Sequence, residues 1–167
     1  MTKDPIAIII DIIRTYMGLT NDQIWQYNSA KVMPNTNGVF VVVDFLASKP
    51  YSVTTDNSVS DLGDYQETVT VQNQEMFSID IFSRDSTART RKEEIIAALA
   101  ANYSLRQQEI YSFKIAKVAH RLNNVSQQDG GSMLNKFVID TTILTWYTNT
   151  KIIEYYDQFP ASEIFNS

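Results

Sequence analysis

The sequence predicts an α+β fold, with an antiparallel or mixed sheet of about four strands packed against two main helices. Two stretches show helical spacing of apolar residues, and several others alternate with a period of two. The predicted order is helix, strand, long strand or hairpin, helix, strand, strand and tail, which is typical of helices covering one face of an antiparallel sheet. The 167 residues contain no repeat or linker. We therefore expect one domain over residues 1–150 and an aromatic tail over 151–167, a possible inter-subunit arm.

The first helix is predicted to begin at Asp4-Pro5, an N-cap followed by proline at the first helical position, and to end at Gly18. One apolar stripe recurs at helical spacing: Ile6, Ile9, Ile10, Ile13 and Met17. A second stripe lies on a different side: Ile8, Ile12 and Tyr16. A helix that is apolar around most of its circumference needs deep burial or a second chain. The second stripe is therefore a candidate subunit interface.

The segments after this helix favour a strand between irregular stretches. Residues 20–28 begin with a capping signal and predict a short helix or turn, and 31–38 predict a loop. The β-branched and aromatic run over 39–47 predicts a central strand. Residues 52–64 are polar and contain Gly63, which predicts a loop, with a short edge strand as the alternative.

Residues 65–82 alternate between apolar and polar side chains, as a half-buried strand does. The apolar positions are Val69, Val71, Phe77, Ile79 and Ile81. Asn73 and Glu75 fall on the apolar face, so either the strand leaves the core there or a bend near 73–74 divides it. A continuous strand would span about 60 Å at about 3.3 Å per residue and would project as a ribbon.

The second half of the chain predicts a helix from Asp85 or Ser86 to about Tyr103. A strand, a flexible turn and a second strand follow over 110–119, 123–132 and 136–148. The tail carries four aromatic residues within a short span: Tyr155, Tyr156, Phe159 and Phe165. Leaving these side chains in water is unfavourable, so the tail either folds back on its own domain or docks onto another chain. They complete the set of candidate interface residues.

Charge and composition exclude several classes of protein. The chain has 14 basic and 19 acidic residues, a net charge of −5 and a pI near 4.8, whereas a nucleic-acid reader normally presents a basic face. An acidic wall repels phosphate and is compatible with DNA that passes without binding. There is no cysteine, so disulfides and thiolate chemistry are excluded. Charges interrupt the apolar N-terminal run well before the roughly 18 residues that span a bilayer, so we expect synthesis in the cytoplasm and no membrane partner.

The sequence predicts no catalytic residue, no cofactor site and no metal site. His120 is the only histidine, and a zinc site without further imidazoles or thiols would be atypical. Ser112, Ser126 and Ser132 lack the surroundings of a nucleophile elbow, and Asp129-Gly130-Gly131 lacks the phosphate-loop pattern.

Other polar and aromatic residues leave alternatives open. Asp44 lies in an apolar strand, where a buried carboxylate can take part in acid–base catalysis. More commonly, such a residue lies at a strand end or pairs with an arginine. Arginines 84, 89 and 91 flank a helix start, where an anion site is less favoured than a solvated face or a salt bridge to a neighbouring subunit. Tyr111 and Phe113 suggest base stacking, but the chain lacks a basic groove, which favours a role in the core or an interface.

The order and spacing of several segments resemble a known group of proteins. These segments are the apolar first helix, Trp25-Gln26-Tyr27-Asn28, the loop at Pro34, the valine-rich strand, the run 77–83, the helix at 88–95 and two late strands. Over about residues 6–156 the chain resembles the neck and tail-terminator proteins of long-tailed bacteriophages, which join the head to the tail.

The resemblance implies a non-enzymatic virion protein with a tail-terminator-like fold. Such a subunit forms a ring, commonly a hexamer, at the head–tail junction or on top of the tail tube. Its partners would be further copies, the head connector and other tail proteins, with DNA passing through the lumen unbound. No site residues are carried over from this group. The alternatives are another non-enzymatic assembly or adaptor domain, such as a tail-tube or baseplate component, and an enzyme whose site the sequence does not reveal.

Overall fold

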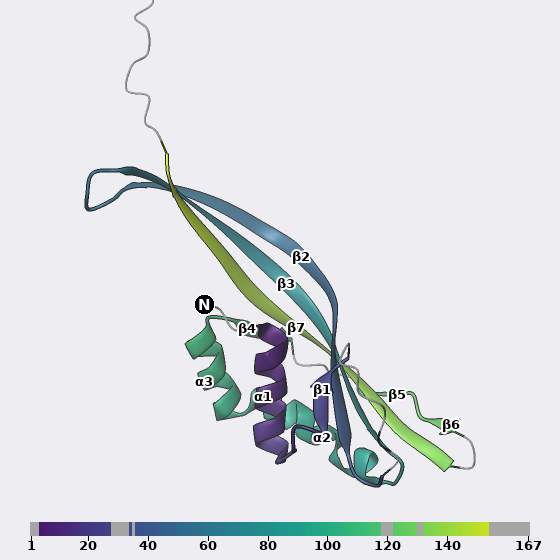
Figure 1. Ribbon diagram of the computed structural model, residues 1–167. Helices are drawn as coiled ribbons and strands as arrows, with labels where there is room; N and C mark the ends of the chain where they lie inside the picture. Colours follow the sequence, from purple (N-terminus) through teal and green to yellow (C-terminus); the bar gives the residue numbers. More distant parts are fainter. Residues whose placement is uncertain (1–3, 28–33, 35, 118–121, 130–131, 154–167) are drawn as a thin grey trace, which may run out of the picture.

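Three long strands carry most of the structure. The computed structural model describes residues 4–27, 34, 36–117, 122–129 and 132–153 (Figure 1). The helices are α1 (Pro5–Met17), α2 (Thr87–Ala100) and α3 (Asn102–Tyr111). The strands are β1 (Ile24–Gln26), β2 (Phe40–Val59), β3 (Tyr65–Ser83), β4 (Lys114–Lys117), β5 (Asn123–Asn124), β6 (Gln127–Asp129) and β7 (Ser132–Ile152).

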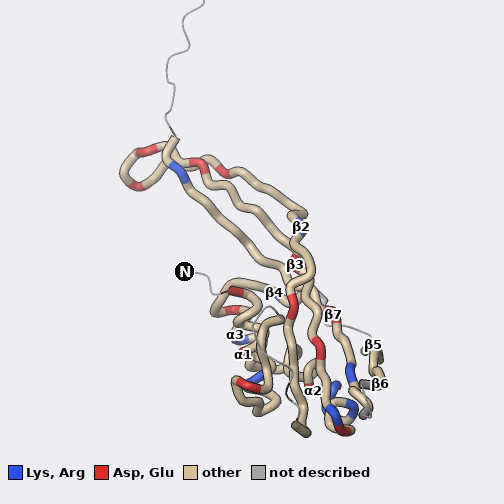
Figure 2. Tube along the Cα trace, turned by 45° about the vertical axis from the view of Figure 1, so that its right-hand side comes forward, with Lys and Arg blue, Asp and Glu red and all other residues tan. Residues whose placement is uncertain are grey.

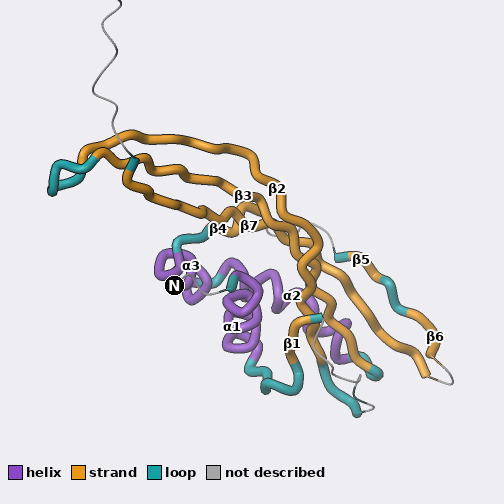
Figure 3. The backbone as a smooth tube through the Cα atoms, turned by 45° about the horizontal axis from the view of Figure 1, so that its top comes forward, coloured by secondary structure: helices purple, strands orange, loops and turns teal. Residues whose placement is uncertain are grey.

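The predicted α+β class is confirmed, but the estimate of about four strands and two helices was too low. The described residues form a seven-stranded sheet in the order β1-β2-β3-β7-β4, with β5 and β6 also paired to β7. All pairings are antiparallel except the parallel β1–β2 pair. Figure 3 shows the helices gathered beside the base of the sheet while the long strands continue past them. The additional strands β1, β5 and β6 are short, at two or three residues each, which is too short for periodicity to reveal.

Helix α1 has the predicted start and end. The Asp4 carboxylate accepts a hydrogen bond from the Ile6 amide at 3.0 Å, and Gly18 ends the helix in the left-handed region at φ 65°. Helix α1 contacts α2, α3, β1 and β2. Both of its apolar stripes are therefore covered by the chain itself, apart from Tyr16 at the C-terminal end.

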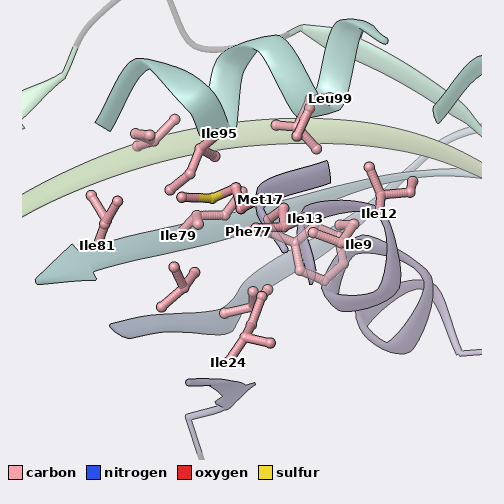
Figure 4. Close-up of a cluster of buried hydrophobic side chains, with 14 of the residues drawn as sticks. Ile9, Ile12, Ile13, Met17, Ile24, Phe77, Ile79, Ile81, Ile95 and Leu99 are labelled. Atoms are coloured by element: carbon pink, nitrogen blue, oxygen red, sulfur yellow. The ribbon is translucent and has the colours of Figure 1, made fainter. Parts of the chain in front are cut away.

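The main core lies between α1, α2 and the helix-facing side of the sheet (Figure 4). Its largest fully buried side chains come from both helices and from the inner halves of β3 and β7: Phe77, Ile8, Ile9, Ile12, Ile13, Ile79, Ile81, Ile95, Leu99, Ile139 and Ile143. A second cluster covers the opposite face, because neighbouring residues of a strand point to opposite sides. It consists of Trp25, Phe40, Val42, Phe82 and Leu134.

The predicted second helix is divided in two. Ala101 is extended, with φ −70° and ψ 157°, and ends α2 before α3 begins. This change of direction lets the Tyr103 hydroxyl donate to the Asp11 carboxylate of α1 at 2.8 Å, which raises the pKa of Tyr103. Helix α3 occupies the start of the strand predicted over 110–119, and among the described residues of that segment the strand is β4.

Three segments predicted to be irregular, 20–28, 52–64 and 123–132, contain strands, because their residues pair with neighbouring strands. For 52–64 the edge-strand alternative is the one observed, although the strand is longer than expected. Residues 52–59 belong to β2 and pair regularly with residues 72–65 of β3. The stretch 20–28 contains β1, and the predicted turn over 123–132 contains β5 and β6. Strand β3 is continuous, as one of the two sequence alternatives required, and β7 extends through Ile152, beyond the predicted domain limit at residue 150.

A candidate assembly surface on the arm

The outer part of the long strands projects beyond the helices, and we call it the arm (Figure 1). It comprises residues 46–59 of β2, 65–76 of β3, 145–152 of β7 and the turn 60–64. Phe77, Ile79 and Ile81 of β3 are fully buried, whereas no residue of β3 from 65 to 76 is buried. The sheet thus leaves the core at Phe77, and the arm has little of its own chain to pack against.

The helix-side face of the arm carries an apolar row beyond the polar positions Asn73, Glu75 and Thr145. Val53, Val71 and Tyr147 lie side by side across β2, β3 and β7. Val53 and Tyr147 are each 61% exposed. Val69 follows on β3, and Tyr147 also lines the cleft between the arm and the helices. An exposed apolar row on a projecting ribbon is typical of a surface that another chain covers.

The opposite face of the arm carries mainly hydroxyl and amide groups. The hydroxyls of Thr68 and Thr150 are 3.0 Å apart, and those of Thr70 and Thr148 are 3.3 Å apart. Such cross-strand pairs stabilise a sheet whose face is in water. The two faces of the arm therefore differ in chemistry, as in a sheet with one side covered and one side wet.

The two edges of the arm differ in how they are protected. Near the base, the β2 edge has bulges at Leu46 and Tyr51 with Lys49 and Pro50 between them, devices that prevent a foreign strand from pairing. Beyond Tyr51, residues 52–59 are regular. Residues 145–152 of β7 contain no bulge, proline or glycine. Among the described residues, each of these stretches has only β3 as a neighbour.

The backbone groups on the free edges follow from the hydrogen bonds at the tip. The Ile153 amide donates to the Tyr65 carbonyl at 3.0 Å, so the backbone groups of Ile153 point toward β3. Successive residues of a strand alternate in direction, so the amides and carbonyls of every second β7 residue, counted from Ile152, point away from β3 to the free edge. These residues are Trp146, Thr148, Thr150 and Ile152. The Ser60 amide donates to the Asp64 carbonyl at 2.8 Å, so the backbone groups of Ser60 point toward β3. By the same alternation, the amides and carbonyls of four β2 residues point away from β3 to the free edge. These are Val53, Thr55, Asn57 and Val59.

The two free stretches lie at the same height on opposite sides of the arm. Residues 52–59 of β2 are paired with 72–65 of β3, and residues 145–152 of β7 are paired with 73–66. Both stretches run from the base to the tip, because both are antiparallel to β3. Each copy of the chain thus presents two unpaired edges of equal length and the same direction.

A cleft of about 220 Å³ lies where the arm leaves the helices. It is lined by Asp4, Pro5, Ile8, Asn73, Glu75, Tyr111, Ser112, Phe113, Thr145, Trp146 and Tyr147. The Glu75 carboxylate accepts a hydrogen bond from the Thr145 hydroxyl at 2.9 Å. Asp4 is engaged in capping α1. Both carboxylates of the cleft therefore already have partners within the chain.

The structure places the predicted interface residues differently. Ile8 and Ile12 are 2% and 0% exposed and lie in the chain's own core, so predicting them as an interface with a second chain was wrong. Tyr16 is 48% exposed. The four tail aromatics lie outside the described residues. The free edges of the arm were missed because they consist of backbone groups, and the one sequence signal was the β-branched run Val53-Thr54-Thr55.

The residues that the sequence analysis weighed for catalysis or binding lie in the following places in the structure. Asp44 is half-buried and lies beside Ser78 of β3. Arg91 pairs with Glu94 at 2.7 Å and donates to the Met17 carbonyl at 2.8 Å, so its ion pair lies within the chain. Phe113 is buried in the core, as its structural alternative predicted. His120 lies outside the described residues.

The described residues contain no group of three or more histidine, cysteine or acidic side chains arranged to hold a metal ion. Among them, no helix is long and apolar enough to cross a membrane. No model of a known protein family matches the chain, and no curated protein matches it either. The case for function therefore depends on the arm and on the resemblance described above.

Proposed function

We propose that the chain is a structural subunit of a virion, which assembles through its arm into a ring around the DNA passage at the head–tail junction or at the top of the tail tube. The observation that carries this proposal is the pair of free edges, equal in length and level with each other. The position in the virion, the hexameric number and the partners in the head connector and tail come from the resemblance.

Joining the β7 edge of one copy to the β2 edge of the next satisfies both edges at once. The two stretches run in the same direction, so the new pair is parallel, with evenly spaced hydrogen bonds. A contact between two different surfaces of identical chains is heterologous, and it produces a ring when the rotation closes. The bulges, Lys49 and Pro50 near the base of β2 prevent pairing there, so the new pair is restricted to the outer half of the arm.

The helix-free face of the sheet is the better lining for a DNA passage. On the three long strands this face carries four carboxylates and two lysines, and hydroxyls and amides occupy much of the arm. The charged residues are Asp44, Asp56, Asp80, Asp140, Lys49 and Lys136. Lys136 pairs with Asp80 at 2.7 Å. The remaining charge is negative and repels phosphate, which suits DNA that slides without being held.

The substitution Thr148→Pro tests the free edge directly. It removes an amide that points away from β3, and proline is tolerated on an edge strand when its nitrogen faces solvent. In the ring, the facing carbonyl of the neighbouring copy would lose its donor, at a cost of about 1–3 kcal/mol at every interface. We expect rings, seen by light scattering and negative-stain microscopy, to be replaced by folded monomers.

Thr148→Ala is the matched control. It removes the hydroxyl that faces Thr70 but keeps the edge amide, so we expect rings to persist. Far-UV circular dichroism should match the wild type for both variants. Rings formed by the proline variant as readily as by the wild type would contradict edge pairing, and a wild-type chain that forms no ring would contradict the proposed function.

A further inference from the structure

The two ends of the long sheet have complementary shape and charge, which points to a contact between copies along the axis of the ring. One end is the turn at the tip of the arm. The other is a cleft beside α2 at the start of β7. The contact between them rests on the proposed ring only for its direction.

The tip of the arm presents an apolar side chain on a well-held turn. The Gly63 amide donates to the Ser60 carbonyl at 2.9 Å, and the Asp64 amide donates to the Ser60 hydroxyl at 3.0 Å. Gly63 has φ 88°, a conformation that side-chain-bearing residues rarely adopt. These bonds fix the turn, and Leu62 extends from it with 90% of its surface exposed.

The tip is acidic (Figure 2). Asp56, Asp61, Asp64 and Glu67 lie within twelve consecutive residues that contain no lysine or arginine. The nearest cation across the sheet is Lys151, which pairs in register with Glu67. An apolar residue surrounded by carboxylates suits a partner surface that is apolar at its centre and basic around it.

The cleft beside α2 has these properties. Its volume is about 420 Å³, and its lining contains two cations and no carboxylate: Arg89, Lys92, Asn124, Ser126, Met133, Asn135 and Phe137. Met133 is 58% exposed. The Lys92 ammonium lies 5.5 Å from the centre of the Phe137 ring and also contacts Glu93 at 2.6 Å. Arg89 is exposed and forms no ion pair with another described residue, so its charge is available to a partner.

The tip cannot reach the cleft of its own chain. Met133 lies at the start of β7 and Lys151 near its end, which separates them by about 60 Å at about 3.3 Å per residue. The occupant must therefore be another molecule. In a ring whose arms all point the same way, every tip lies at one end and every cleft at the other. A second copy in the next ring is the molecule that brings an acidic tip to this cleft.

We infer that Leu62 of one copy inserts into the cleft between Arg89 and Phe137 of a copy in the adjacent ring, with Asp61 and Asp64 facing Arg89 and Lys92. This contact joins rings tip to base into a stack. It deepens the proposed function by naming the axial partner of the ring, which is a further ring of the same chain.

Charge reversal with mixing tests the contact. In Asp61→Lys the introduced lysine faces Arg89, and in Arg89→Glu the introduced glutamate faces Asp61, so each variant alone places like charges opposite each other. Each variant alone is expected to form single rings, whereas an equimolar mixture should restore stacks, because the introduced lysine then faces the introduced glutamate and the native Asp61 faces the native Arg89. Glu109→Lys on the exposed surface of α3 makes the same charge change away from both ends and should stack like the wild type.

Leu62→Ala measures the apolar part of the contact. Full burial of a leucine side chain contributes about 1.5–3 kcal/mol, which corresponds to stacking weakened about tenfold to hundredfold. Sedimentation velocity and negative-stain microscopy distinguish stacks, single rings and single copies.

The outcomes separate this contact from the ring itself. Wild-type rings that remain single at every concentration, or a mixture that fails to restore stacks, would overturn the tip-to-cleft contact while leaving the ring intact. A chain without rings would refute the proposed function instead. The mixing readout would still apply there, since tip-to-cleft contacts would link single copies into open chains.

Discussion

Phe77 marks the point where the sheet passes from core to arm, and its removal should test that division quantitatively. The side chain is fully buried on β3 and packs edge-on against Phe45 of β2, with ring centres 5.6 Å apart and an angle of 68°. Phe77→Ala removes a large core side chain and leaves a cavity. Substitutions of this kind cost about 3–5 kcal/mol.

Phe45→Ala is the control, because it removes the same ring pair from the other side. Phe45 is 43% exposed, so less apolar surface is lost from burial. Scaling the burial of a large apolar side chain to this exposure gives about 1–2 kcal/mol. The aromatic contact itself, about 0.5–1.5 kcal/mol, is lost in both variants and does not contribute to their difference. We therefore expect Phe77→Ala to be the more destabilising, by about 1–4 kcal/mol.

Urea unfolding followed by the fluorescence of Trp25 and Trp146 measures these values. Both variants are best compared in the Thr148→Pro background, because assembly stabilises the folded state by mass action. For a chain of this size about 4 kcal/mol corresponds to a fall of roughly 8–16 °C in Tm. Equal losses in the two variants would show that Phe77 is no more part of the core than Phe45, and that the arm does not begin where we place it.

Two further predictions concern pH and the tail. The hydrogen bond from Tyr103 to Asp11 raises the pKa of Tyr103 above its usual 10.0, so its stabilising effect is complete below that pH and is lost as the pH rises further. The difference in free energy of unfolding between the wild type and Tyr103→Phe should therefore shrink only in strongly alkaline urea titrations, and a difference that already disappears at neutral pH would contradict this. Deleting residues 154–167 should leave a folded domain that associates more weakly by light scattering, whereas unfolding on truncation would show that the tail belongs to the core.

Local signals made the ends of α1 predictable from sequence. Asp4-Pro5 and Gly18 act through their own backbone geometry, and the structure contains the cap and the left-handed residue that they predict. The break at Ala101 has no such signal. Alanine is a good helix former, and the chain turns there to bring Tyr103 to Asp11, a contact between residues far apart in the sequence. Tertiary contacts of this kind override local preference.

The outer half of β2 was predicted as a loop because strand periodicity depends on burial. Alternation arises where one face of a strand meets a core, and residues 52–59 meet none. Their strand conformation comes from pairing with β3. The same reasoning explains the continuity of β3 through Asn73 and Glu75: these polar residues fall on the inner face where the sheet leaves the core, and they line the cleft beside α1.

The apolar surface of the first helix and the edges of the arm have different roles from those that the sequence indicated. Ile8 and Ile12 looked like an interface because a helix apolar on most sides lacks cover when considered alone, but α2, α3 and the sheet supply that cover. The edges left for pairing with another copy consist of backbone amides and carbonyls on β2 and β7. A two-fold dimer through either edge would leave the other edge of both copies unpaired. Only head-to-tail pairing uses both edges of every copy, and this is why the arm favours a ring over a dimer.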